Sequence, residues 1–256
     1  MTTSRLRNAF RAIPAIPLTA LAVLAVQVLR AALRPDLPSF PNQDPSGRFG
    51  DPSLPHLRVV ALGDSSITAP GVADLDNIWI RRIARTLSDR YHIELISLAV
   101  GGSKAGDVVE GQLAEAVRLR PDVAVVSVGA NDALRGVTPE RYRRHLETIV
   151  TNLATTGAGV MVFGVGDLGS IPRLPLTVRK WATRRSADFD RVAREVVVSI
   201  PRAVKAYTRG RSSTAFFEEP GLFAGDLFHA GDAGHAIFAA DAIEAVEAAI
   251  AGRHVA

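Results

Sequence analysis

Runs of apolar residues alternate with helix-periodic segments along most of the chain. The apolar runs occupy residues 57–62, 93–100, 123–129 and 159–166 and, more weakly, residues 213–218. Helical periodicity lies between and after these runs, at residues 78–87, 107–119 and 138–153 and from residue 232 onward. Strands that alternate with helices predict a parallel sheet covered on both faces. The pattern therefore predicts an α/β fold, a three-layer α/β/α sandwich with a parallel five-stranded sheet.

The first 34 residues have a different pattern. Residues 1–11 contain three arginines and no acid, and residues 12–29 contain no charged side chain. A helix of that length spans about 27 Å, close to the thickness of the hydrocarbon core of a bilayer. The pattern predicts an N-terminal hydrophobic helix that is either a membrane anchor or a signal segment, with a helix packed on the domain as a further alternative.

The end of this apolar segment favours an anchor that is not cleaved. A cleavable signal needs small residues before the cut, whereas Arg30 and Leu33 occupy the obvious positions. Arginines flank both ends, so the orientation is weakly specified, and the basic leader favours a domain outside the cytoplasm. Secretion after signal cleavage is the alternative.

A proline-rich segment follows the hydrophobic one. Residues 35–56 contain six prolines, which argue against a helix or a central strand. We expect an extended linker over residues 35–56, which joins the N-terminal segment, residues 1–34, to a folded domain over residues 57–256.

Composition excludes several kinds of chemistry. The 256 residues include no cysteine, which excludes disulfides, a cysteine nucleophile, thiolate metal sites and a lipoprotein-type anchor. The histidines form no metal-spaced cluster, so neither a metal nor another cofactor is expected. The net charge is +4, but the sequence contains no basic motif interleaved with aromatic residues, which is typical of nucleic-acid binding. A membrane surface is therefore favoured over nucleic acid as the partner.

Four polar clusters lie at the ends of apolar runs or directly before the last helix. They occupy residues 63–66, 100–107, 129–132 and 225–235. Each cluster alone is ordinary turn chemistry. Together they contain what acyl transfer requires: a serine nucleophile, a histidine base oriented by an acid, and donors for an oxyanion. Because the carboxyl ends of parallel strands meet at one edge of the sheet, the clusters are expected to meet there.

In this order and spacing the clusters resemble the conserved blocks of the SGNH/GDSL hydrolase superfamily of esterases, lipases and related acyl-group enzymes. The resemblance covers residues 57–240 and implies a flavodoxin-like fold. It implies the following roles: Ser65 as nucleophile, Asp226 and His229 as orienting acid and base, and an oxyanion hole formed by the N–H groups of Ser65 and Gly102 and the side chain of Asn131. The chain departs from the family pattern at Ser66, usually leucine, and at Ala230, usually proline.

Neighbouring residues offer competing interpretations. Ser66 is the alternative nucleophile. A second Asp-x-x-His pair, Asp232 and His235, is predicted to cap the last helix and pack against the domain. Asp64 and Asp132 are predicted to brace the turns in which they lie, because tight turns leave backbone N–H groups that need acceptors.

A long basic segment, residues 171–211, separates the fourth apolar run from the weak fifth one. Trp181 lies in it between Lys180 and Arg184. One interpretation is a solvated helix face, and the other is a surface that lies on anionic lipid headgroups.

The implied function is cleavage of acyl esters, such as lipids or acylated sugars, by a Ser-His-Asp triad. Two alternatives stay open. An acyltransferase would pass the acyl group to a sugar or lipid hydroxyl instead of water, and a non-catalytic, membrane-tethered module would use the same fold only for binding. The nature of the acceptor and the length of the acyl chain are not specified by these residues.

Overall fold

The computed structural model describes residues 18–34, 36–209 and 211–253. Within these residues the strands and α-helices are α1 (Leu18–Leu33), β1 (Gly47–Phe49), β2 (His56–Gly63), α2 (Ser65–Thr68), α3 (Trp79–Leu87), β3 (His92–Ser97), α4 (Ala105–Gly111), α5 (Leu113–Arg118), β4 (Val123–Ser127), α6 (Ala130–Leu134), α7 (Pro139–Thr155), β5 (Gly159–Phe163), α8 (Leu176–Ser199), β6 (Ala203–Ala206), α9 (Arg211–Glu218) and α10 (Asp232–Gly252). Short 3-10 turns lie at Leu75–Asn77, Leu168–Ser170 and Pro220–Leu222.

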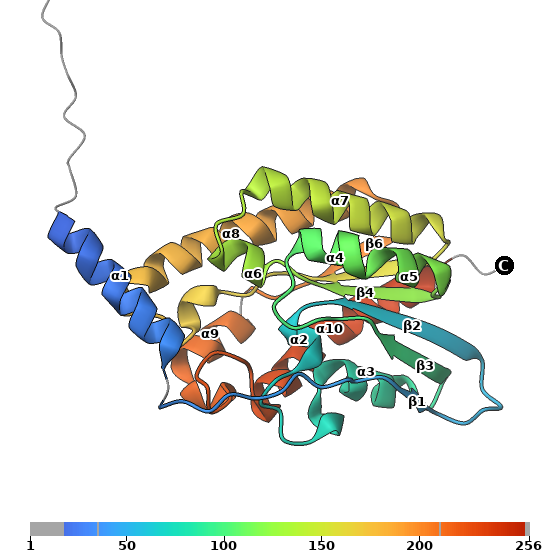
Figure 1. Ribbon diagram of the computed structural model, residues 1–256. Coiled ribbons are helices and arrows are strands. Elements are labelled where there is room, and N and C mark those ends of the chain that lie inside the picture. The colour runs from blue at the N-terminus through green and yellow to red at the C-terminus, as the bar shows by residue number, and fades with distance from the viewer. Residues whose placement is uncertain (1–17, 35, 210, 254–256) are drawn as a thin grey trace, which may run out of the picture. The chain divides into compact units, whose positions relative to one another are not determined.

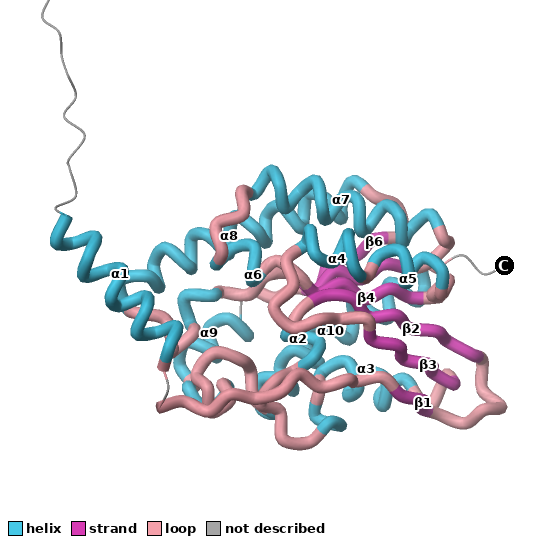
Figure 2. The backbone as a smooth tube through the Cα atoms, viewed as in Figure 1, coloured by secondary structure: helices cyan, strands magenta, loops and turns pink. Residues whose placement is uncertain are grey.

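The sheet confirms the predicted α/β architecture. Its six strands have the order β1-β3-β2-β4-β5-β6 (Figure 2). Five of them, β2 to β6, run parallel, and β1 pairs antiparallel with β3 at the edge. The central strand β4 is buried along its whole length, as a parallel strand covered on both faces must be.

The fifth parallel strand is not the one predicted. Residues 213–218 form most of helix α9, and β6, Ala203–Ala206, takes the place at the sheet edge. β6 has only four residues, and Lys205 in it forms an ion pair with Asp190 of α8 at 2.8 Å. A strand this short, with a charged residue whose partner comes from a helix, has no apolar run that a periodicity search can find.

The proline-rich segment also differs from the expected extended linker. β1 lies within it and pairs with β3. The side-chain amide of Gln43 donates hydrogen bonds to the carbonyls of Ala69 at 3.0 Å and Val72 at 2.8 Å. An edge strand is paired on one side only, so the prolines around it remove no hydrogen bond from the sheet. The segment therefore belongs to the same compact unit as the sheet, Pro35–Ala256.

Residues Met1–Arg34 form a separate unit. The apolar segment predicted over residues 12–29 is helical from Leu18 and continues to Leu33; its first residues, 12–17, and the basic leader lie outside the described residues. No helix in the described part of the chain is both long enough and apolar enough to cross a membrane.

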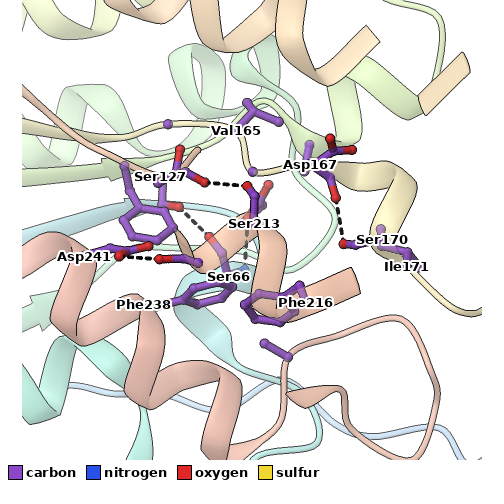
Figure 3. A pocket seen from close by; sticks show the side chains of 18 of the residues that line it. Ser66, Ser127, Val165, Asp167, Ser170, Ile171, Ser213, Phe216, Phe238 and Asp241 are labelled. Atoms are coloured by element: carbon purple, nitrogen blue, oxygen red, sulfur yellow. Dashed lines mark hydrogen bonds between the residues drawn. The ribbon is translucent and has the colours of Figure 1, made fainter. Parts of the chain in front are cut away.

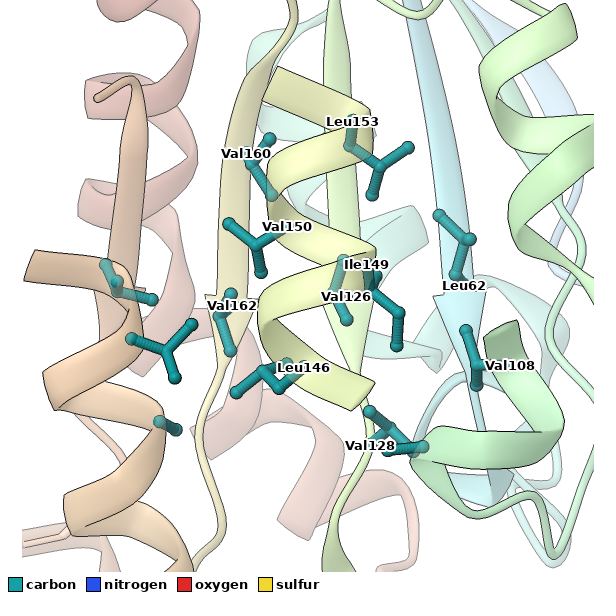
Figure 4. Packing of buried hydrophobic residues seen from close by; sticks show 14 of the residues in the cluster. Leu62, Val108, Val126, Val128, Leu146, Ile149, Val150, Leu153, Val160 and Val162 are labelled. Carbon is teal, nitrogen blue, oxygen red and sulfur yellow. The ribbon is translucent and has the colours of Figure 1, made fainter. Parts of the chain in front are cut away.

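Two helical layers cover the sheet (Figure 1). Successive residues of a strand point to opposite faces, and β2 accordingly sends Val60 and Leu62 to one core and Val59 and Ala61 to the other. Helices α4, α5, α7 and α8 pack on the first face, where α7 contributes much of the core (Figure 4). Helices α3 and α10 pack on the second face.

Most of the predicted helices are confirmed, and one is divided. α7 begins after Thr138, whose hydroxyl accepts a hydrogen bond from the N–H of Arg141 at 3.2 Å. The helix predicted over residues 107–119 is interrupted at Gln112, between α4 and α5. The buried amide of Gln112 bonds to both backbone groups of Gly63, with its oxygen 2.8 Å from the N–H and its nitrogen 3.0 Å from the carbonyl. The interruption thus fastens the helical layer to the end of β2.

Gly63, the last residue of β2, has no room for a side chain. Its φ is +146°, and a Cβ atom would lie 1.9 Å from the carbonyl oxygen of Ser127. We expect Gly63→Ala to lower the free energy of unfolding by at least about 3 kcal/mol, because strain and a backbone clash add. Urea denaturation followed by circular dichroism measures this.

Gly111 is the matched control for that substitution. A Cβ atom there would have no neighbour within 4 Å, and alanine favours the helix by roughly 0.5–1 kcal/mol over glycine. Gly111→Ala should therefore be neutral or stabilising, and equal losses in the two variants would contradict the close approach at Gly63.

Candidate functional site

The predicted polar clusters meet at the carboxyl edge of the sheet. Ser65 is the first residue of α2, directly after β2. Gly102 lies after β3 with a φ of +82°, a conformation that favours glycine. Asn131 lies in α6 after β4, and its amide nitrogen is 3.3 Å from Asp64 Oδ2 and 3.2 Å from the carbonyl oxygen of Ser103. Three loops that are far apart in sequence are thus brought into contact around Asp64.

Asp64 organises the turn that presents Ser65. It is the N-cap of α2, and its carboxylate accepts a hydrogen bond from the N–H of Ser66 at 3.0 Å. Burial raises the pKa of Asp64, although hydrogen bonds from Ser66 and Asn131 and the charge of His229 act in the opposite direction. The predicted role of a brace agrees with this arrangement.

Asp226 and His229 form a close pair in the loop before α10. Nδ1 of His229 lies 2.6 Å from Oδ2 of Asp226. The other carboxylate oxygen accepts the N–H groups of Phe228 at 2.9 Å and His229 at 3.0 Å. Burial alone would raise the pKa of Asp226, but these hydrogen bonds outweigh it and hold the pKa below its ordinary value. An ionised acceptor places the imidazole proton on Nδ1 and leaves Nε2 free of it.

A cavity of about 150 Å³ connects the serine and histidine loops (Figure 3). Its walls include Asp64 and Ser66, the two neighbours of Ser65, and Phe228 and Ala230, the two neighbours of His229. Gly102 and Asn131 are not part of its walls. The wall thus includes the chain neighbours of Ser65 and His229 but neither of these two residues themselves.

Ser66, the alternative nucleophile, is engaged elsewhere. Its hydroxyl is 2.5 Å from the hydroxyl of Ser127 at the end of β4. Its carbonyl accepts the indole N–H of Trp79 at 2.8 Å. These contacts hold Ser66 in the wall of the cavity and favour Ser65 as the reactive serine.

Two buried side chains, Asp132 and Gln112, support the loops. Asp132 accepts the N–H of Ala105 at 2.9 Å, which joins the loop after β4 to the start of α4. Burial, with a contribution from the charges of Asp64 and Asp107, raises the pKa of Asp132 to about 6. Asp132 thus braces more than its own turn. The sequence does not predict the role of Gln112, because a glutamine within a helical pattern gives no signal of a distant partner.

The second Asp-x-x-His pair packs the domain but does not cap the helix as predicted. Gly231 is the N-cap of α10. Asp232 instead accepts hydrogen bonds from the N–H of Ala73 at 3.1 Å and the amide of Asn77 at 2.6 Å. His235 is buried, and its Nδ1 accepts the N–H of Trp79 at 3.3 Å. The predicted cap is wrong because the carboxylate of Asp232 is engaged by donors of the long loop before α3, which is distant in sequence.

His235 makes stability depend on pH. Burial lowers its pKa to about 3. Below the ordinary histidine pKa of about 6.5, the unfolded chain takes up a proton that the folded protein excludes. The free energy of unfolding therefore decreases as the pH is lowered, by about 1.4 kcal/mol per pH unit. Between about pH 7 and about pH 5 we expect wild type to lose roughly 2 kcal/mol more than His235→Gln. Urea unfolding of both proteins at the two pH values checks this, and parallel losses would contradict it.

Among the described residues no group of three or more histidine, aspartate or glutamate side chains is arranged to hold a metal ion.

The comparison with known families matches residues 61–237 to the GDSL-like Lipase/Acylhydrolase family. The chain belongs to this family. The matched range contains Ser65, Gly102, Asn131, Asp226 and His229. The family match and the hydrogen-bonded pair at its C-terminal end agree with the resemblance seen in the sequence.

Two bacterial relatives of this family member share part of its sequence. A GDSL-like esterase of Mycobacterium tuberculosis is 33% identical over 153 residues, which is 57% of this chain and 47% of the relative. Esterase TesA of Pseudomonas aeruginosa is 27% identical over 112 residues, 42% of this chain and 53% of the relative. The matched region thus spans about half the length of each relative.

The fold of the family member is also found among solved structures. LAE5, an alpha/beta hydrolase enzyme from the metagenome of Lake Arreo, Spain, superimposes with a TM-score of 0.62 at 19% identity, over 76% of this chain and 97% of that one. At this identity the likeness concerns the fold alone.

Proposed function

We propose that this chain is a carboxylic ester hydrolase in which Ser65 is the nucleophile. The observation that carries the proposal is the 2.6 Å hydrogen bond between Asp226 and His229, beside a cavity whose walls also flank Ser65. A serine hydroxyl needs a base to become a nucleophile, and a histidine oriented by a carboxylate is such a base. The names of the two relatives, both esterases, point the same way.

The reaction has two halves. Nε2 of His229 takes the hydroxyl proton as Ser65 Oγ attacks the ester carbonyl, and the imidazolium then gives that proton to the departing alcohol. A water molecule next attacks the acyl-enzyme, with His229 again as base, and the acid and free Ser65 are released. Asp226 keeps the proton on Nδ1 and stabilises the charged ring.

The carbonyl oxygen becomes negative in both halves of the reaction. The N–H groups of Ser65 and Gly102 and the side-chain amide of Asn131 are proposed to donate hydrogen bonds to it. The position of Asn131 supports this, because its amide lies against the loop that carries Ser65. It donates there to Asp64 Oδ2 at 3.3 Å and to the Ser103 carbonyl at 3.2 Å, and one of these long bonds is exchanged for a bond to the oxyanion. Donors fixed in advance stabilise a developing oxyanion without reorganisation.

A serine-directed phosphonate probe tests the proposal. The intact protein is incubated with the probe, and the modified residue is located by mass spectrometry. An adduct on Ser65 that is absent from His229→Ala supports the mechanism. No adduct on any residue would favour a binding module that retains the fold.

Replacing Asn131 tests the oxyanion donor. Asn131→Ala is expected to lower kcat by a factor of about 10²–10³ with little change in KM, because the lost bond is strongest in the transition state. Asn152 lies on α7 with its amide bonded to the carbonyl of Thr148, and Asn152→Ala is the control that should keep full activity. Steady-state kinetics on a short-chain ester measures both, and equal kcat values for the two variants would remove Asn131 from the mechanism.

We also propose that the protein is attached to a membrane through residues 12–29, with the domain outside the cytoplasm. The uncharged length of that segment and the basic leader before it support the proposal. Carbonate extraction and protease accessibility in cells test it: extraction into the soluble fraction, or a domain protected from external protease, would contradict it.

Helix α8 is proposed to contact the same membrane. Its exposed face includes Leu176, Lys180, Trp181 and Arg184, a combination typical of interfacial segments. Residues 36–256 should therefore bind anionic vesicles better than neutral ones, and Trp181→Ala should weaken that binding. Equal binding of the variant and the wild type to anionic vesicles would contradict the proposal and indicate that this face of α8 is only solvated.

A further inference from the structure

The cavity beside Ser65 extends beyond the two loops that carry Ser65 and His229, and most of its wall is apolar. It runs over the carboxyl ends of β4, β5 and β6 and between α9 and α10 (Figure 3). Four of its aromatic wall residues are Phe163, Phe216, Phe223 and Phe238. Phe216 stacks on Phe238 with ring centroids 5.4 Å apart and meets the edge of Phe223 at 5.2 Å. α9 thus contributes an aromatic ring to the wall of the cavity.

The serine hydroxyls in the wall are engaged in hydrogen bonds with other wall residues. The pairs are Ser66 with Ser127 at 2.5 Å, Ser212 with Asp241 at 2.5 Å, Ser213 with the Thr208 carbonyl at 3.0 Å and Ser170 with the Asp167 carbonyl at 2.7 Å. The wall thus combines five phenylalanines with serine hydroxyls that are already engaged in hydrogen bonds, and such a surface favours an apolar ligand over a sugar.

We propose that this cavity holds the acyl chain of the ester and restricts that chain to about six carbon atoms. The inference rests on the proposed function. An apolar protein cavity of about 150 Å³ accommodates one benzene molecule, which has six carbons, and the cavity beside Ser65 has that volume. Longer chains have to displace Phe216 or leave their ends in water.

The chemistry assigns the acyl chain rather than the alcohol to the cavity. The acyl group stays bonded to Ser65 Oγ between the two halves of the reaction, so a cavity that holds it does not have to release it before water attacks. The alcohol has to depart before water attacks, and burial between α9 and α10 would retain it. The side of the site toward solvent is therefore left to the alcohol.

Two series of esters test the inference on the full chain. In the first, p-nitrophenyl esters carry acyl groups from acetyl to decanoyl; in the second, acetate esters carry alcohols of increasing length. For wild type, kcat/KM is expected to rise by about fourfold per methylene up to about hexanoyl, as apolar surface is buried, and to fall for octanoyl and decanoyl. The alcohol series should show only a weak dependence on length.

Phe216→Ala and Phe217→Ala form a matched pair. Phe216 lines the cavity, whereas Phe217, the next residue of α9, is 50% exposed and is not part of the wall. Phe216→Ala should move the maximum to octanoyl or decanoyl. Phe217→Ala should match wild type. Ser213→Leu, which fills the cavity, should move the maximum toward acetyl, so the conclusion does not depend on one variant folding.

The outcomes separate this inference from the proposed function. Cleavage of esters with the same acyl preference in wild type, Phe216→Ala and Ser213→Leu would overturn the acyl pocket and leave the hydrolase intact. A change confined to the alcohol series would assign the cavity to the leaving group and also overturn it. If wild type cleaves no ester and takes no phosphonate on Ser65, the proposed function fails and the acyl pocket fails with it.

Discussion

Ser65→Ala is expected to lower kcat for ester hydrolysis by a factor on the order of 10⁵–10⁶ while leaving the fold unchanged. Without Oγ no acyl-enzyme forms, and only the oxyanion donors and substrate binding remain to assist a direct attack by water. The methyl group that replaces the hydroxymethyl group lies at the first position of α2, where alanine is compatible with the helix. Kinetics on an acetyl ester, with thermal unfolding by circular dichroism, measures both effects.

Ser66→Ala is the control for this substitution. The hydroxyl of Ser66 bonds to Ser127, across a sequence separation of 61 residues, so its loss should reduce stability by about 1 kcal/mol and alter kcat by less than about tenfold. The reverse pattern, with activity kept in Ser65→Ala and lost in Ser66→Ala, would identify Ser66 as the nucleophile. His229→Ala should resemble Ser65→Ala, because residues that act as one unit are not additive.

Asp226→Asn is expected to lower kcat by about 10⁴. The amide of asparagine donates a hydrogen bond where the carboxylate accepted one, so the imidazole of His229 takes the other tautomer and carries its proton on Nε2. That nitrogen can then no longer accept the proton of Ser65. Because the pKa of Asp226 lies below its ordinary value, the acid is ionised at neutral pH, and the loss should persist at neutral and mildly alkaline pH.

Asp232→Asn is the matched control, since it alters the second Asp-x-x-His pair. Asp232 holds the loop before α3 through Ala73 and Asn77, so the variant should lose stability and keep its kcat. Rescue of kcat in Asp226→Asn by raising the pH, or an equal loss of kcat in Asp232→Asn, would contradict the assignment of the orienting acid. The pair of variants separates catalysis from folding with the same chemical change.

The placement of the candidate residues at the carboxyl edge of the sheet follows from local signals in the sequence. Each reactive residue follows an apolar run or precedes a helix within a few positions, and connectivity alone places the ends of parallel strands at one edge. The same local signals fail for β6, where Lys205 depends on Asp190 of α8, and for residues 213–218, where Phe216 and Phe217 look alike in sequence but face opposite environments. They fail again for β1, because pairing with β3 is set by distant residues.

By itself, the sequence determined the α/β class, the family and the residue types available at the carboxyl edge of the sheet. Only the tertiary structure decided that Ser66, and not Ser65, is held by Ser127. It also decided that Asp226 and His229 lie beside the cavity, that Asp232 and His235 pack the domain, and how large the cavity is. The physical reason is range. Periodicity and turn chemistry act over a few residues, whereas hydrogen bonds such as Ser66 to Ser127 or Asn77 to Asp232, 155 residues apart, exist only once the layers have packed.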